Sequence, residues 1–248
     1  SALFTGSVPA ITGIAGNGWY DQRERRDVYC VEDKSVKTVG SDSKAGEMSP
    51  KNLLTNTIAD ELRLATNFRS KVIGVAIKDR GSILPAGHAG NGAYWYDGGT
   101  GKWITSTYYR NELPDWVKAF NDSKIIDKYY EKGWNTLYPI ETYVNSTKGV
   151  KDYESKPFGA NALDFPYDLK GFIGKNYGAI SSTPMGNTMT LEMAKAAVKG
   201  EALGKGAFTD MLTVSLSSTD YIGHSFGPNS IEAEDTYLRL DRDLADFF

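Results

Sequence analysis

The feature that most constrains the fold is a pair of short apolar runs that each come after a predicted helix. KVIGVAI (71–77) consists almost wholly of aliphatic residues, several of them β-branched, which is typical of a strand buried on both faces. DMLTVSLSS (210–218) is a second run of this kind. Predicted helices over 49–66 and 190–199 precede them. Because a helix followed by a buried strand is the repeating unit of α/β proteins, we expect an α/β fold.

The helix over 49–66 is predicted to begin with Ser49 as its N-cap and Pro50 in its first turn. A β-hairpin is expected over 93–109, around DGGTG. Further helices are predicted over 113–121, 123–133 and 229–248, the last with Asn229 or Ser230 as its cap. We treat 1–248 as one α/β domain in which about 85–185 forms an insertion or cap outside the sheet.

Composition excludes several function classes. The net charge of −3 argues against a general nucleic-acid binder, because such proteins carry basic patches. No run of about 18 apolar residues predicts a membrane span. The single cysteine, Cys30, excludes an internal disulfide. The first residues, SALFTGSVPA, contain neither an initiator methionine nor a signal sequence, so we expect the chain to be an internal part of a longer protein.

Asp220 and His224 follow the second apolar run, in a segment expected to be a loop. A carboxylate and a neutral imidazole together suit zinc or another transition metal, and Gly223 allows a turn that aims both at one ion. The alternative is structural: Asp220 caps the turn and His224 packs on the following helix. The spacing by itself leaves both interpretations open.

Two further candidates concern anion binding. Where the strand over 71–77 ends, an extended backbone would place Lys78 and Arg80 on one face and Asp79 on the other, which makes a site for a phosphoryl group. The alternative is an exposed basic strand end. Asn17, flanked by glycines, could donate hydrogen bonds to an oxyanion, or it could take a left-handed turn conformation.

Other residues have structural interpretations. His88 is expected to be structural, and the aromatic residues Tyr94, Trp95 and Tyr96 are expected in the core. Cys30 has no neighbours in sequence that would make it a nucleophile. The chain contains neither a G-x-x-x-x-G-K-[ST] phosphate loop nor a G-x-S-x-G elbow.

Four stretches occur in this order in one known family: TGSVPAITGIAGNGWYD, KDRGSILPAGH, STDYIGHSFGP and LRLDRDL, which begin at Thr5, Lys78, Ser218 and Leu238. The chain resembles the alkaline phosphatase superfamily in its type I phosphodiesterase/nucleotide pyrophosphatase branch, and within it the threonine-nucleophile alkaline phosphatases of Bacteroidetes. This resemblance implies an alkaline-phosphatase-like three-layer sandwich with a mostly parallel central sheet and an inserted cap region.

The resemblance also implies a two-zinc phosphoesterase that works through a phosphothreonine intermediate. One zinc would be bound by Asp220, His224 and a distant histidine, and the other by two aspartates and a histidine. Asn17 and the pair Lys78 and Arg80 would contact the phosphoryl oxygens of a small phosphate ester or of inorganic phosphate. Two added cations stabilise a monoester more than a diester, since the monoester carries more negative charge.

The same resemblance places the threonine nucleophile and four of the six zinc ligands outside residues 1–248. With two histidines, the chain cannot supply all of those ligands, so we expect it to be inactive by itself and to bind zinc weakly or not at all. The intact enzyme is expected in the periplasm, and exposed surface of the isolated chain could drive self-association. Alternatives are a phosphodiesterase or nucleotide pyrophosphatase, and a non-catalytic module that binds a phospho-ligand or a partner.

Overall fold

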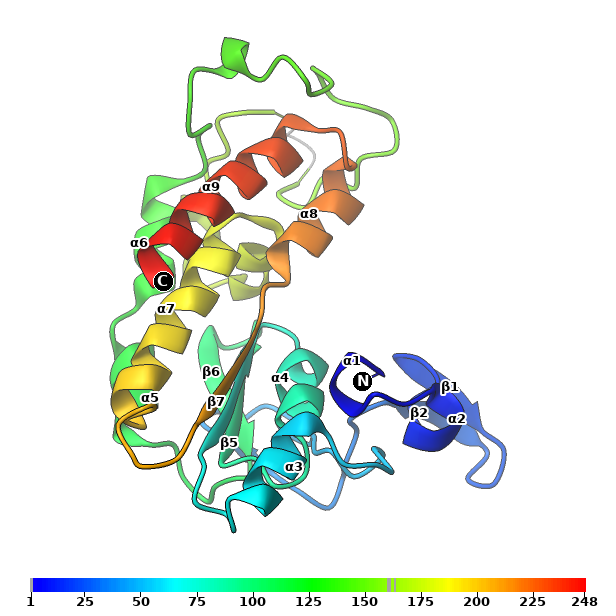
Figure 1. Ribbon diagram of the computed structural model, residues 1–248. Coiled ribbons are helices and arrows are strands. Elements are labelled where there is room, and N and C mark those ends of the chain that lie inside the picture. The colour runs from blue at the N-terminus through cyan, green and yellow to red at the C-terminus, as the bar shows by residue number, and fades with distance from the viewer. Residues whose placement is uncertain (1, 160–161, 163) are drawn as a thin grey trace. The chain divides into compact units, whose positions relative to one another are not determined.

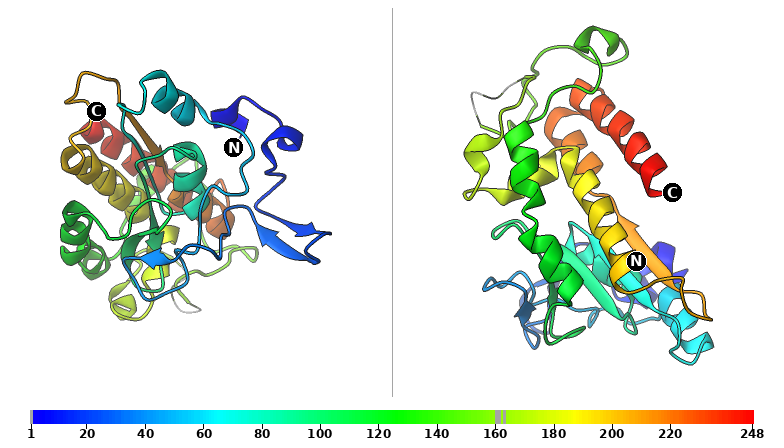
Figure 2. Two further views of the ribbon diagram at one scale, coloured as in Figure 1. Left: turned by 90° about the horizontal axis from the view of Figure 1, so that it is seen from below. Right: turned by 90° about the vertical axis from the view of Figure 1, so that its left-hand side faces the viewer.

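The structure is a computed structural model that describes residues 2–159, 162 and 164–248 (Figure 1). The described chain divides into two compact units. Unit 1 contains the central sheet and comprises 1–97, 102–119 and 196–215, and unit 2 comprises 98–101, 120–195 and 216–248. The helices α5 (Asp115–Asp122) and α7 (Met185–Gly200) are divided between the two units. Figure 2 shows the elements in two further views.

Unit 1 confirms the α/β class. The elements that lie wholly within it are α1 (Ala2–Thr5), α2 (Pro9–Thr12), β1 (Gly18–Asp21), β2 (Arg26–Tyr29), β3 (Thr38–Val39), α3 (Ile58–Ala65), β4 (Val72–Ala76), α4 (Asp79–Ala86), β5 (Gly92–Asp97), β6 (Lys102–Ser106) and β7 (Met211–Ser215). Among the described residues, a five-stranded sheet has the order β3-β6-β5-β4-β7, and β1 and β2 form a separate hairpin.

The sheet is mixed. Strand β4 pairs in parallel with both β5 and β7, whereas the pairs β5-β6 and β3-β6 are antiparallel. The hairpin expected over 93–109 is present as β5 and β6. These two strands belong to the central sheet, so the expectation that everything over 85–185 lies outside the sheet is wrong for them. Their aromatic side chains are the reason, because Tyr94, Trp95 and Trp103 are at most 2% exposed and fill the core.

Helix α4 packs tightly on the centre of the sheet, next to β4, β5 and β7 (Figure 1). The contact depends on Gly74 in β4. A Cβ atom built there would overlap the carbonyl oxygen of Ser82 and lie 3.2 Å from the Cβ of Ala86. Glycine therefore lets the backbones of α4 and β4 approach closely, and this brings the start of α4 to the carboxyl end of β4.

The helix predicted over 49–66 begins only at Ile58, so the predicted cap is wrong. The N-cap is Thr57, whose hydroxyl accepts from Asp60 N at 3.2 Å while the Asp60 carboxylate accepts from Thr57 N at 2.8 Å. This reciprocal capping box fixes the start of α3. Ser49 instead donates to the Asp33 carboxylate at 2.6 Å, a partner distant in sequence that a local pattern does not reveal.

Unit 2 is mostly helical and irregular. Its complete elements are α6 (Ile125–Lys132), the 3₁₀ helices η1 (Ile140–Thr142), η2 (Lys170–Phe172) and η3 (Tyr177–Ser182), and the helices α8 (Ser218–Phe226) and α9 (Ile231–Phe247). The N-cap of α9 is Ser230, one of the two residues predicted for this position, and its hydroxyl accepts from Ala233 N at 3.1 Å. Helices α8 and α9 contact each other.

A buried carboxylate organises the core of unit 2. The side chain of Asp235, on α9, is 0% exposed. Its oxygens accept from Trp134 Nε1 at 2.8 Å, Tyr143 Oη at 2.6 Å, Leu137 N at 2.6 Å and Arg239 Nε at 2.6 Å. A buried charge is stable only when its acceptor sites are filled, and here one carboxylate ties the irregular segment over 134–143 to α9.

Candidate functional site

The pair Lys78 and Arg80 lies at a strand-to-helix junction rather than on an extended strand. Strand β4 ends at Ala76, Lys78 is the N-cap of α4 with an extended backbone, and Asp79 and Arg80 are already helical. The predicted alternation of faces is therefore wrong, because helix formation starts one residue after Lys78. The location nevertheless suits anion binding, since α4 starts with its N–H groups at the carboxyl end of a parallel strand.

Tyr29, on β2, holds the side chains of both Asp79 and Arg80. The Tyr29 hydroxyl donates to Asp79 Oδ1 at 2.6 Å and accepts from Arg80 Nη1 at 3.0 Å. All three side chains are partly buried. Asp79 thus does not point away from Arg80, as an extended strand would require; both converge on one phenol. No local sequence pattern points to Tyr29, since it lies far from Arg80 along the chain.

The contacts at this junction favour the charged form of the Arg80 guanidinium. Burial disfavours the charged form of Arg80, but its contacts with Tyr29 and the charge of Asp79 outweigh this and raise its pKa. Burial raises the pKa of Tyr29, and the Asp79 carboxylate adds to the effect. Burial also raises the pKa of Cys30 to about 11, which agrees with the expectation that this thiol is not a nucleophile.

Asn17 lies in an exposed loop directly before β1. Its carbonyl oxygen accepts from Cys30 N at 2.9 Å, so the loop is attached to the end of β2 beside Tyr29. Its φ is not positive, unlike that of Asn67, so the left-handed conformation considered from the sequence is absent at Asn17. The hairpin β1-β2 therefore links the Asn17 loop to the junction that carries Arg80.

Asp220 and His224 lie in unit 2, on helix α8, so the loop predicted for them is wrong. The segment is helical from Ser218 to Phe226, and the N–H of Ser218 is bound by the Asn187 side chain at 3.0 Å. Gly223 is accommodated inside the helix, and the chain turns only at Gly227, which has a φ of 92°.

The helical spacing of four residues brings the two candidate ligands to one face of α8. His224 Nε2 lies 3.4 Å from Asp220 Oδ1, with side-chain exposures of 82% and 53%. A carboxylate and an imidazole at this separation fit two positions of a zinc site. The described part of the chain gathers no group of three or more His, Cys, Asp or Glu that could hold a metal ion.

His88 has the structural position expected of it. Its Nε2 lies 2.8 Å from the Leu53 carbonyl oxygen and its Nδ1 3.5 Å from Asp60 Oδ2. The hydrogen bond to Asp60 raises the pKa of His88, although burial opposes this. In return, and despite the opposing effect of burial, the hydrogen bonds from His88, Thr57 and Ala89 lower the pKa of Asp60 to about 2. The histidine therefore joins the end of α4 to the start of α3.

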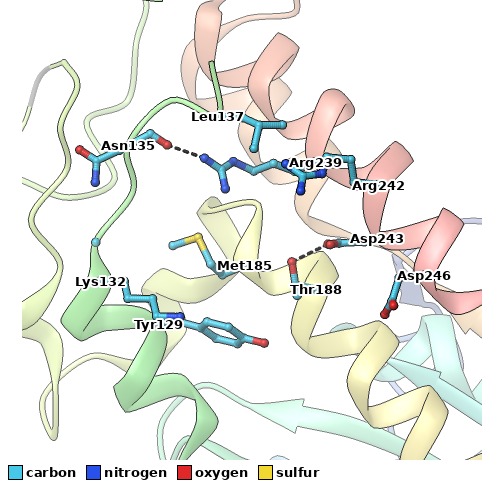
Figure 3. Close-up of a pocket in the computed structure, with 11 residues that line it drawn as sticks. Tyr129, Lys132, Asn135, Leu137, Met185, Thr188, Arg239, Arg242, Asp243 and Asp246 are labelled. Atoms are coloured by element: carbon cyan, nitrogen blue, oxygen red, sulfur yellow. Dashed lines mark hydrogen bonds between the residues drawn. The ribbon is translucent and has the colours of Figure 1, made fainter. Parts of the chain in front are cut away.

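A pocket of about 610 Å³ in unit 2 contains none of the candidate site residues predicted from the sequence (Figure 3). It lies between α6, α7 and α9, and Tyr129, Met185 and Arg242 contribute to its lining. Thr188 donates to Asp243 Oδ2 at 2.6 Å on one side, and Arg239 donates to the Asn135 carbonyl oxygen at 2.6 Å on the other. Since these residues come from separate segments, no local pattern indicated the pocket.

The mixed sheet and the polar junction at the carboxyl end of β4 place unit 1 in the class of α/β domains in which ligands bind at the carboxyl ends of parallel strands. The family model for type I phosphodiesterase / nucleotide pyrophosphatase matches residues 1–248, and the chain belongs to this family. Homologues in this family are named alkaline phosphatases, which are hydrolases.

Several curated relatives match over the whole chain. Alkaline phosphatase PhoV of Synechococcus elongatus is 63% identical over 248 residues. A protein named calcium-transporting ATPase from Myroides odoratus is 60% identical, and alkaline phosphatase PafA of Elizabethkingia meningoseptica is 54% identical, each over 250 residues. These alignments cover 100% of this chain but 45%, 46% and 46% of the relatives, so the chain spans about half their length.

The crystal structure of wild-type alkaline phosphatase PafA has the same fold, with a TM-score of 0.97 and 54% sequence identity. The match covers 100% of this chain and 48% of that chain. The predicted resemblance to alkaline phosphatases of this kind is therefore confirmed, together with the α/β fold.

Proposed function

We propose that the protein to which this chain belongs is a zinc-dependent hydrolase of phosphate monoesters that uses a threonine nucleophile and a phosphothreonine intermediate. The observation that most supports this is the position of Arg80, whose guanidinium donates to the Tyr29 hydroxyl. Arg80 lies two residues after Lys78, at the start of a helix that follows a buried parallel strand. A doubly charged phosphoryl group matches such a site, because an arginine offers a planar fork of donors and a lysine adds a point charge.

In this proposal Asn17, Lys78 and Arg80 bind the phosphoryl oxygens and orient the phosphorus atom toward the nucleophile. The charges of Lys78 and Arg80 are placed before the reaction begins, so they stabilise the added charge of the transition state without reorganisation. Asp220 and His224 would hold one zinc, which when bound supplies Lewis acidity. The family membership favours an enzyme over a non-catalytic module. The ATPase name of the Myroides relative concerns that protein alone.

Replacing Lys78 by alanine in the full-length protein is expected to lower kcat/KM for an aryl phosphate monoester about 100-fold, the typical cost of one donor to a developing oxyanion. Activity on a bis-aryl phosphate diester should change by less than about threefold, because a diester has less charge for the cation to neutralise. Steady-state kinetics on both substrates test this.

Lys44→Ala is the matched control for Lys78→Ala, since Lys44 is an exposed lysine of the same unit. Equal losses on both substrates would contradict the monoesterase proposal and favour the alternative, a phosphodiesterase or nucleotide pyrophosphatase.

The 248-residue chain by itself is expected to give no turnover of an aryl phosphate above background, with or without added zinc. It contains two histidines, and His88 is engaged with Leu53 and Asp60, which leaves His224 as the candidate ligand. Colorimetric assay at micromolar protein, with the full-length protein as the positive control, measures this. Robust zinc-dependent hydrolysis by the chain alone would contradict the proposal that the nucleophile and four of the six zinc ligands lie outside residues 1–248.

We also propose that the intact protein is periplasmic and that the isolated chain self-associates through the free edge of β7, the last strand of the described sheet. Across the described residues, no helix combines the length and the apolar character needed to cross a bilayer.

A further inference from the structure

Tyr29 connects the two parts of unit 1 that we propose to contact phosphate: its hydroxyl contacts Arg80, and its backbone pairs with Gly18, next to Asn17. We propose that Tyr29 is a positioning residue that keeps the guanidinium of Arg80 separated from Asp79, so that its remaining donors are free for a phosphate monoester. This inference rests on the proposed function, and it assigns a role to a residue that would not itself touch the substrate.

The direction of the hydrogen bonds at Tyr29 is fixed by chemistry. Arginine has only donors, so the phenol oxygen must accept from Arg80 Nη1 at 3.0 Å. The single phenol proton is then available for Asp79 Oδ1 at 2.6 Å. The resulting chain runs from guanidinium to phenol to carboxylate, and each step polarises the next.

The phenol also prevents the more obvious pairing. A carboxylate and a guanidinium in adjacent residues would otherwise tend toward a direct ion pair, and a bidentate one would occupy the donors that a phosphoryl group needs. The described residues include no ion pair between the side chains of Asp79 and Arg80, and none of them accepts a hydrogen bond from Nε or Nη2 of Arg80. Asp79 Oδ1 instead accepts from Tyr29 and from the backbone N–H of Arg80, at 2.6 Å each.

Tyr29 also fixes the distance between the guanidinium and the Asn17 loop. Tyr29 pairs with Gly18 across the β1-β2 hairpin, and the next residue, Cys30, donates its N–H to the Asn17 carbonyl oxygen at 2.9 Å. The ring packs against the core of unit 1, which leaves the phenol little freedom. Strand β2 therefore holds the flexible side chain of Arg80 and the exposed Asn17 loop at a fixed separation.

Tyr29→Phe removes only the hydroxyl. In the full-length protein, it is expected to lower kcat/KM for an aryl phosphate monoester about tenfold and to weaken competitive inhibition by inorganic phosphate by a similar factor, in line with the loss of one hydrogen bond to a charged group. Activity on a bis-aryl diester should stay within about twofold. In an Arg80→Ala background, Tyr29→Phe should not lower kcat/KM for the monoester further, because the guanidinium that Tyr29 positions is absent.

Tyr20→Phe is the matched control, because Tyr20 lies in the same hairpin and is 59% exposed. Asp79→Asn is a second variant that keeps Tyr29 and weakens its acceptor, with an expected loss of about threefold on the monoester alone. A purely structural role would instead lower both activities and the unfolding midpoint, and its effect would persist in the Arg80→Ala background; that result overturns the inference.

The two proposals fail in different ways. If Arg80→Ala alone leaves monoester hydrolysis unchanged, the proposed function is wrong. If Arg80→Ala lowers it and Tyr29→Phe does not, only the positioning role is wrong.

Discussion

Asp235→Ala is expected to lower the free energy of unfolding by about 4 kcal/mol. It removes the buried carboxylate of an ion pair and leaves the donors that surround this carboxylate without an acceptor. Trp134, Tyr143 and the backbone of Leu137 each lose a hydrogen bond at a site that is 0% exposed, and Arg239 loses its carboxylate. Urea unfolding followed by tryptophan fluorescence measures the change, since Trp134 itself donates to Asp235.

Asp241→Ala is the control for this prediction, because Asp241 lies on the same helix and is exposed. It is expected to change the free energy of unfolding by less than about 0.5 kcal/mol. A loss at Asp235 that is no larger than the loss at Asp241 would show that the carboxylate does not organise this core.

Gly74→Ala is expected to cost about 3 kcal/mol in the free energy of unfolding, at the upper end of overpacking effects. The added methyl group would overlap the Ser82 carbonyl oxygen, which is backbone and has no alternative rotamer to adopt. Helix α4 must then move away from β4. Because α4 carries Arg80, activity of the full-length protein on a monoester should also fall.

Gly206→Ala is the matched control, since an added Cβ there meets only Phe208 N at 4.0 Å and Gly206 does not have a positive φ. Urea unfolding of both variants tests the pair. Equal stability of Gly74→Ala and the wild type would mean that the close approach of α4 to β4 is dispensable.

Much of the fold follows from local patterns. The apolar run over 71–77 contains β4, all of whose residues are buried, and the aromatic stretch over 93–109 contains β6 and all but the first residue of β5. The sequence predicts Asn229 or Ser230 as the cap of α9, followed by acidic residues in the first turns, and the N-cap is Ser230. Such features depend on residues within one helical turn or one hairpin.

The errors occurred where distant residues compete for the same groups. Ser49 is a good cap by its sequence, but Asp33 takes its hydroxyl, and α3 starts later at Ile58. The segment of Asp220 and His224 contains a glycine and was expected to be a loop, yet Asn187 binds its first N–H and the helix continues through Gly223.

For the candidate site, the sequence determined which residue types are available: two cations after a buried strand, an asparagine between glycines, and an aspartate four residues before a histidine. Only the tertiary structure decided that Asp79 and Arg80 meet at Tyr29 and that the Asn17 loop is attached to the same strand. The physical reason is that a hydrogen bond depends on the position of two atoms in space, and folding brings together side chains that no spacing along the chain relates.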